Sequence, residues 1–77
     1  MQINHTKMWI KDIGLLIKNR RKALKITQPY LAELAKISVN TLYKIERGDA
    51  NPTLDIIERI AEVLGLQIKL EKKETNL

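Results

Sequence analysis

The fold of this chain is decided by residues 27–48, which read TQPYLAELAKISVNTLYKIERG. Within this stretch, segments 28–35 and 39–47 each place apolar residues at helical spacing. Each segment follows a hydroxyl residue, Thr27 or Ser38, of the kind that caps the first amides of a helix. The pattern predicts two short helices that are joined by a tight turn.

Helices are also predicted on both sides of this pair. Upstream, the spacing of apolar residues predicts a helix that ends near Lys25 and begins at Asp12 or as early as Thr6. Downstream, Thr53 precedes a predicted helix over residues 54–64. The residues expected to face inward are Ile10, Ile13, Leu16, Ile17, Arg21 and Leu24 in the first helix, Leu31, Leu34 and Ala35 in the second, Leu42 and Ile45 in the third, and Leu54, Ile57, Ile60, Ala61 and Leu64 in the fourth. Because Phe is absent, we expect an aliphatic core.

The apolar period changes from helical to alternating after Gly65. Leu66, Ile68 and Leu70 alternate with polar residues, which is typical of a strand over residues 66–71. Every other predicted element is helical, so this strand has no partner in its own chain and leaves an open edge. We expect these three residues to form a dimer interface, as an antiparallel ribbon across a two-fold axis, unless the segment extends the fourth helix or frays in solvent.

The chain of 77 residues has the size of one small domain. We expect an all-α fold of four to five helices with a short C-terminal β-strand, divided into an N-terminal extension (1–9), a domain (10–71) and a flexible tail (72–77). There is no cysteine, and His5 is the only histidine, so disulfides and thiolate metal sites are excluded. The common phosphate-binding, zinc-binding and calcium-binding motifs are also missing, and we expect no enzyme activity, cofactor or metal.

The charge of the chain is distributed unevenly. Fourteen Lys and Arg against nine Asp and Glu give a net charge of +5 and a pI near 9.7. Residues 7–25 contain seven Lys and Arg against one Asp, whereas residues 26–53 balance. A basic segment favours nucleic acid as a partner before a membrane surface, although such a run is also typical of a solvated helix face. No apolar run approaches about 18 residues and no signal peptide is evident, so we expect a cytoplasmic protein without a membrane partner.

Several short motifs together carry a family resemblance. They are IGLLIKNRR at 13–21, Thr27-Gln28, Leu31-Ala32, Ile37-Ser38, IERG at 45–48, Asn51-Pro52 and IAEVLG at 60–65. Over about residues 13–66 the chain resembles the phage-repressor (Cro/CI, or XRE) family of helix-turn-helix proteins. The resemblance implies a repressor-like domain that binds double-stranded DNA as a dimer on a palindromic operator. The chain departs from the family at Lys36, where the family usually has glycine, and a left-handed Lys costs roughly 1 kcal/mol there.

The resemblance implies roles for individual residues, and their chemistry agrees with these roles. The third helix is the reader: Val39 suits a thymine methyl group, Asn40 a bidentate pair with adenine, and Lys44 a guanine or a nearby phosphate. The expected phosphate contacts are Thr27, Gln28, Ser38, Thr41, Tyr43, Arg47, Asn51 and Thr53. Gln28 can also brace the third helix. Arg21 and Glu46 are expected to form a structural pair that orients the reader.

A strand that follows the helix-turn-helix directly, with no effector-binding domain, is similar to HipB-type antitoxins. This narrower resemblance implies a homodimer that represses its own operon and binds a kinase-like HipA-type toxin. The candidate toxin contacts are Asp55, Glu58 and Glu62 on the fourth helix and Met8 and Trp9 near the N-terminus, with a solvated face and core or interface packing as alternatives. Two other functions stay open: a stand-alone repressor, and a protein-interaction module with weak, sequence-independent DNA binding. No small-molecule effector is evident.

Overall fold

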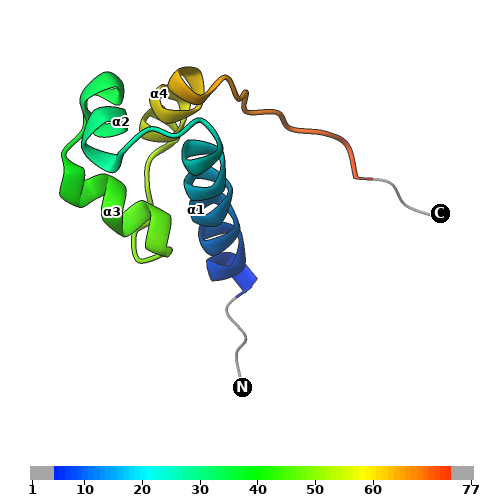
Figure 1. The fold of residues 1–77 in the computed structure, drawn as a ribbon. Helices are drawn as coiled ribbons and strands as arrows, with labels where there is room; N and C mark the ends of the chain where they lie inside the picture. Colours follow the sequence, from blue (N-terminus) through cyan, green and yellow to red (C-terminus); the bar gives the residue numbers. More distant parts are fainter. Residues whose placement is uncertain (1–4, 74–77) are drawn as a thin grey trace.

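The described part of the chain, residues 5–73 of a computed structural model, folds into four helices. They are α1 His5–Ala23, α2 Gln28–Ala35, α3 Val39–Arg47 and α4 Leu54–Leu64 (Figure 1). Helices α2 to α4 have the predicted bounds. Helix α1 begins at His5, next to the earlier of its two predicted starts, and ends at Ala23, slightly before the predicted end near Lys25. None of these helices is long and apolar enough to span a membrane. The predictions for residues 1–4 and 74–77, parts of the N-terminal extension and of the flexible tail, lie outside the described residues.

Helices α2, α3 and α4 begin at the predicted caps. The hydroxyl oxygens of Thr27, Ser38 and Thr53 accept hydrogen bonds from backbone amides three residues later, at 3.2, 3.0 and 3.2 Å. Each cap satisfies one of the amides that a helix N-terminus leaves without an intrahelical partner. Gly48 and Gly65 end α3 and α4, as predicted, and both are left-handed.

The turn between α2 and α3 contains Lys36 in the left-handed conformation, with φ 60° and ψ 47°. The backbone amides of Lys36 and Ile37 donate to the carbonyls of Glu33 and Ala32 at 3.2 and 3.0 Å. These bonds close the end of α2 in the way that a glycine turn does. The turn therefore keeps the geometry for which glycine is best suited, and Lys36 bears a strain of roughly 1 kcal/mol.

The core lies where the four helices meet. Helix α1 packs against α3 and α4, and α2 packs against the same two helices. The buried core residues are Ile17 in α1, Leu31, Ala32 and Ala35 in α2, Leu42 and Ile45 in α3, and Ile57, Ile60 and Leu64 in α4. In Figure 1, α2 and α3 follow one another on one side of the molecule, with α1 across from them. This aliphatic core supports α3 from within and leaves its outer face to solvent.

Four leucines that the sequence places inside are exposed instead. Leu16, Leu24, Leu34 and Leu54 expose 56%, 41%, 46% and 69% of their surface. Helix α2 buries Ala32 in place of Leu34, because this short helix packs against α3 and α4 at once. Leu54 is the first residue of α4, and its side chain tilts toward the open N-terminal end, as helical side chains do. Leu24 lies just beyond the end of α1, and Leu16 lies at the edge of its packed face.

The predicted strand over residues 66–71 is not formed in the single chain. Residues 66–73, the arm, have no regular secondary structure and lead away from the helices (Figure 1). Leu66 packs against the core, whereas Leu70 is 97% exposed. A strand needs a neighbour for its backbone hydrogen bonds, and the part of this chain that is described contains only helices beside the arm.

Candidate nucleic-acid interface

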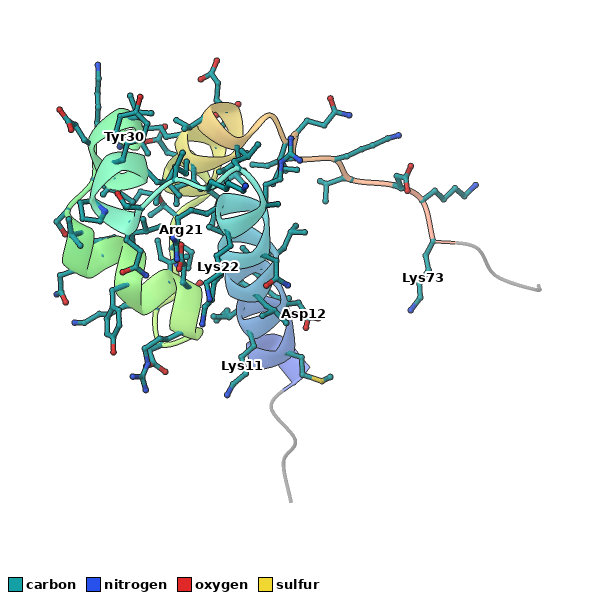
Figure 2. All side chains as sticks on the ribbon, viewed as in Figure 1. Lys11, Asp12, Arg21, Lys22, Tyr30 and Lys73 are labelled. Carbon is teal, nitrogen blue, oxygen red and sulfur yellow. The ribbon has the colours of Figure 1, made fainter. Side chains whose placement is uncertain are left out.

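A buried ion pair joins α1 to α3. Arg21 Nε and Nη2 donate to the two carboxylate oxygens of Glu46 at 2.7 and 3.0 Å. The two side chains expose only 10% and 2% of their surface. Arg21 Nη1 donates to the Ile26 carbonyl at 2.9 Å, and Gln28 Nε2 donates to Glu46 Oε1 at 2.9 Å. This Arg21–Glu46 clasp ties α3 to α1 and to the start of α2 (Figure 2, where Arg21 is labelled).

The clasp restricts the direction of α3. Two charges that leave water lose their hydration, and their attraction offsets that loss only when their hydrogen bonds are complete. Among the described residues, no buried side-chain nitrogen or oxygen lacks a partner. A guanidinium that binds a carboxylate through two parallel bonds also has a fixed orientation relative to it. The clasp therefore sets the rotation of α3 about its own axis, and with it the face that points outward.

Gly14 lets the backbones of α1 and α3 come into contact. A Cβ atom at this position would overlap the carbonyl oxygen of Ile45 and lie 3.0 Å from that of Glu46. Every other residue type carries this atom, so only glycine fits the crossing of the two helices. In the sequence, Gly14 is only one residue of a family motif. Its role at the helix crossing could not be predicted, because no local pattern shows which backbone segment will pack against it.

The outer face of α3 carries the three residues that are predicted to contact bases. Val39, Asn40 and Lys44 are all exposed. The buried residues of the same helix are Leu42, Ile45 and Glu46. Helix α3 thus presents a small apolar group, an amide and an ammonium on a support that is fixed from behind. These are groups that can meet the methyl and hydrogen-bonding edges of bases in the major groove.

Several predicted phosphate contacts lie at helix starts and are engaged within the chain. The hydroxyls of Thr27, Ser38 and Thr53 cap helices, and Ser38 Oγ also donates to the Thr41 hydroxyl at 2.8 Å. Asn51 is exposed in the loop before α4. The hydroxyls are therefore used to fix the helix starts, where free amides and the positive ends of the helix dipoles favour an anion.

Two neighbours hold Arg47 at the C-terminal end of α3. Its Nη1 donates to the Tyr43 hydroxyl at 2.9 Å, and its guanidinium lies 5.5 Å from the centre of the Tyr43 ring. Its Nε donates to Asp49 Oδ2 at 3.0 Å. Tyr43 first, and then Asp49, raise the pKa of Arg47 above its ordinary value. Arg47 and Tyr43 are predicted phosphate contacts, whereas the sequence does not single out Asp49, which already binds one side of the Arg47 guanidinium.

Two arginines without a predicted role close the ends of helices. Arg20 Nε donates to the Leu64 carbonyl, at the end of α4, at 2.9 Å. Arg59 Nη1 donates to the Lys36 carbonyl in the turn at 3.0 Å, and Arg59 Nη2 donates to Asp55 at 2.7 Å. The bonds to the Leu64 and Lys36 carbonyls satisfy groups that the ends of helices leave without an intrahelical partner, and Asp55 holds Arg59 in place.

Exposed lysines therefore carry the basic surface of α1. Arg20 and Arg21 are engaged within the fold, whereas Lys11 and Lys22 are exposed and project from α1 in Figure 2. The Lys11 side chain lies against Gly48, directly after α3. Lysine ammonium groups on flexible stems bind phosphates as point charges, without the fixed geometry of an arginine pair. This surface is therefore suited to attracting a polyanion by charge, and not to recognising a particular base sequence.

Comparisons with known proteins agree with this arrangement. The sequence profile of the Helix-turn-helix family (HTH_3) matches residues 17–70. The chain is 45% identical over 56 residues to the immunity repressor protein of Bacillus phage phi105. It is 34% identical over 65 residues to a protein of Methanococcus maripaludis that is named as an HTH-type transcriptional regulatory protein. These matches cover 73% and 84% of this chain but only 39% and 20% of the two relatives, so the chain spans less than half of either.

A solved structure has a similar fold. The crystal structure of the restriction-modification controller protein C.AhdI from Aeromonas hydrophila superposes with a TM-score of 0.74 and 25% sequence identity. The superposition covers 78% of this chain and 91% of that chain. The likeness therefore extends over most of both molecules.

Proposed function

This chain belongs to the helix-turn-helix family, and from that premise we propose that it represses transcription by binding double-stranded DNA at a specific sequence. The observation that carries the proposal is the Arg21–Glu46 clasp, which holds α3 with its polar face outward. A helix held in one orientation presents the same side chains to a groove each time it docks. The similarity to a phage immunity repressor and to a transcriptional regulatory protein supports the same function.

In this proposal, the outer face of α3 reads the major groove. Val39 contacts a thymine methyl group, Asn40 pairs with an adenine, and Lys44 donates to a guanine or to a neighbouring phosphate. The proposed phosphate contacts are Thr27, Gln28, Ser38, Thr41, Tyr43, Arg47, Asn51 and Thr53. The net charge of +5 attracts any DNA, whereas the base contacts select the site.

The functional unit of this proposal is a homodimer. One reading helix contacts only a few base pairs, so useful specificity needs two copies on a palindrome with half-sites about 34 Å apart, or a multiple of that distance. The arms of two copies pair through Leu66, Ile68 and Leu70 as a two-stranded ribbon. The alternation of the arm and the 97% exposure of Leu70 support this pairing. Such a regulator acts where the genome lies, in the cytoplasm.

A narrower role within this proposal is that of an antitoxin, which represses its own operon and neutralises a HipA-like kinase toxin. The arm that follows α4 directly supports this role, and Glu58, Glu62, Met8 and Trp9 are exposed for contact with a protein. The alternative is a stand-alone repressor, which the similarity to the phage immunity repressor favours. Copurification separates the two roles, because an antitoxin retains the product of an adjacent gene through size-exclusion chromatography.

Selection of bound duplexes from a random pool tests the main proposal. We expect a palindromic consensus with half-sites about one helical turn, or a multiple, apart. Asn40→Ala then lowers the preference at one base pair by about 1–3 kcal/mol and leaves the salt dependence unchanged. Asn19→Ala, at an exposed position on α1, is the matched control and keeps the preference.

The same assay decides the role of Lys44. Lys44→Ala lowers the slope of log K against log salt by about one if Lys44 binds a phosphate, and relaxes one base preference if it binds guanine. A pool with no enriched sequence contradicts the main proposal. Weak binding that vanishes with salt then favours a protein-interaction module with sequence-independent DNA binding.

A further inference from the structure

An apolar groove of about 370 Å³ lies between α1, α4 and the start of the arm. Trp9, Leu16, Pro52, Leu54 and Ile68 are among the residues that line it. Trp9, Leu16 and Leu54 expose 42%, 56% and 69% of their surface to water. Exposed apolar side chains that gather in one groove mark an interaction site, because their burial is favourable. We propose that this groove receives the arm of a second copy of the chain, in an antiparallel register centred on Ile68.

The arm of the same chain leaves the groove open. Ile68 and Lys69 form part of its lining, but the arm then leads away from the helices (Figure 1). Leu70 remains 97% exposed, and Figure 2 shows Lys73 at the end of the arm, away from the helices. Groove and arm thus adjoin one another, and within the described residues neither is covered. A second copy related by a two-fold axis covers both at once, which is how the proposed homodimer would be built.

One register pairs all three apolar residues of the arm with apolar residues. Residues directly opposite each other in an antiparallel pair point to the same face of the ribbon. The two-fold axis of the ribbon can pass either through one residue or between two neighbouring residues. Because apolar and polar residues alternate in the arm, an axis between two residues would set each apolar side chain opposite a polar one. An axis at Ile68 places the two copies of Ile68 opposite each other, and Leu66 opposite the partner's Leu70. An axis at Lys69 places like charges directly opposite, which destabilises a ribbon. An axis at Gln67 places Leu70 opposite residue 64, which belongs to α4.

This register brings the partner's arm onto the groove. The partner's Leu70 lies beside Leu66, and Leu66 and Ile68 line the groove, so the exposed leucine of one copy enters the groove of the other. Trp9 and Leu54 then gain apolar neighbours in place of water. The N-terminal turns of α1, which the helix-turn-helix itself does not require, acquire a role in the dimer.

The charges beyond Leu70 agree with this placement. The partner's arm continues into residues 71–73, Glu-Lys-Lys, which carry one net positive charge, and passes toward the C-terminal end of α4. The exposed Glu58 and Glu62 of α4 adjoin the start of the arm there. A segment with a net positive charge therefore approaches two carboxylates, which adds to the attraction between the two copies.

Single cysteines test the register, because the chain has none of its own. In Ile68→Cys the two cysteines face each other across the axis with Cα atoms about 4.5–5.5 Å apart, a distance that a disulfide spans. In Leu70→Cys they are offset by four residues along the ribbon, or about 13 Å. We expect mild oxidation to convert Ile68→Cys to a covalent dimer at least about tenfold faster than Leu70→Cys. Faster cross-linking of Leu70→Cys overturns the register.

Leu15 and Leu16 provide a matched pair of variants for the groove. These neighbours on α1 expose 55% and 56% of their surface, but only Leu16 lines the groove. Leu16→Glu buries an unpaired carboxylate in the interface, so we expect the dissociation constant of the dimer, measured by sedimentation, to rise at least about tenfold. Leu15→Glu changes that constant less than about threefold, because its carboxylate stays in water.

Trp9 is the only tryptophan and reports on the groove directly. We expect its emission to move to shorter wavelength as the wild-type chain and Leu15→Glu dimerise, because apolar side chains replace water around the ring. Equal effects of the two glutamate variants, or an emission that dimerisation does not change, overturn the assignment of the groove.

Operator binding is measured in parallel on the same proteins. A dimer that selects a DNA sequence but does not cross-link through Ile68→Cys refutes the register and leaves the proposed function standing. A chain that cross-links at this position but selects no sequence contradicts the proposed function and supports the register. The two failures are therefore distinguishable.

Discussion

At the scale of single residues, burial decides what an arginine does in this protein. Arg21 pairs with Glu46 inside the fold, where each charge depends on the other. Arg47 pairs with Asp49 at the surface, where water solvates both partners. The buried pair therefore fixes a helix, whereas the exposed pair keeps a cation beside the proposed DNA contacts and exchanges partners readily.

Arg21→Ala is expected to lower the free energy of unfolding by about 3–5 kcal/mol, because Glu46 is left buried without its cation. Affinity for all DNA sequences falls with it, since α3 loses its support. Urea denaturation and DNA titration measure the two effects. Arg47→Ala is the matched control and leaves the unfolding midpoint nearly unchanged while it weakens DNA binding. An unchanged midpoint for Arg21→Ala, with a shift in one base preference alone, contradicts the structural role.

Lys36→Gly is expected to stabilise the fold by up to about 1 kcal/mol, because glycine adopts the left-handed conformation of this turn without steric strain. The bond from Arg59 uses the backbone carbonyl of residue 36 and is retained. Thermal unfolding measures the gain. Lys36→Ala keeps the strain and serves as the control. A melting temperature that falls in the glycine variant would show that the lysine side chain stabilises the turn in another way.

The residues that the sequence could predict are those with nearby partners. Each helix cap acts on an amide three residues later, so the pattern alone reveals it. Arg20 instead binds a carbonyl 44 residues away, and Arg59 binds carbonyls at the end of another helix. Which carbonyl an arginine reaches depends on how the helices pack. The pairing of Arg21 with Glu46 was expected from the family resemblance, because the local sequence pattern does not indicate which residues pair across the fold.

At the scale of elements, the helices depend on nearby residues, whereas the arm depends on a distant partner. Helices α2 to α4 carry their start and stop signals within their own sequence, and their predicted bounds are those observed. The start of α1 stayed open, because Thr6 and Asp12 are both residues that cap helices. The arm alternates as a strand does, but a strand forms only against a neighbour, and none is present in one copy.

Ser38 caps α3 and is also a proposed phosphate contact, and two substitutions separate these roles. Asp caps a helix as well as Ser, so we expect Ser38→Asp to keep the stability within about 0.5 kcal/mol. Its DNA affinity falls at least about tenfold, because a carboxylate faces a phosphate. Ser38→Ala loses about 1 kcal/mol of stability with the cap. Denaturation and anisotropy titration measure both, and wild-type DNA affinity in Ser38→Asp would place Ser38 away from any phosphate.

Gly14→Ala tests the close crossing of α1 and α3. Alanine has the higher helix propensity by about 1 kcal/mol, yet we expect a net loss of about 1–3 kcal/mol, because the methyl group meets the Ile45 carbonyl. Chemical denaturation measures the change, with Leu15→Ala at an exposed position of the same helix as the control. A stabilised Gly14→Ala variant would mean that the two helices lie further apart.

At the scale of the whole molecule, two surfaces point to two partners. The face of α3 and the exposed lysines suit DNA, while the groove and the arm suit a second copy of the chain. Net charge and the alternation of residues 66–71 are evident in the sequence, so both proposed partners are expected from the sequence alone. The groove could not, because its lining combines α1, the loop before α4, α4 and the arm, which only the packing brings together.

The salt dependence of DNA binding reports how many copies occupy the operator. Ile68→Asp places two carboxylates opposite each other in the proposed ribbon, so the variant is expected to stay monomeric. Half the phosphate contacts then remain, and the slope of log K against log salt falls to about half that of the wild type. Circular dichroism checks that the helices are intact, and Ile68→Val serves as the control that retains both dimer and slope. Equal slopes for Ile68→Asp and wild type would mean that both contact the same number of phosphates, and the ribbon would then have no part in DNA recognition.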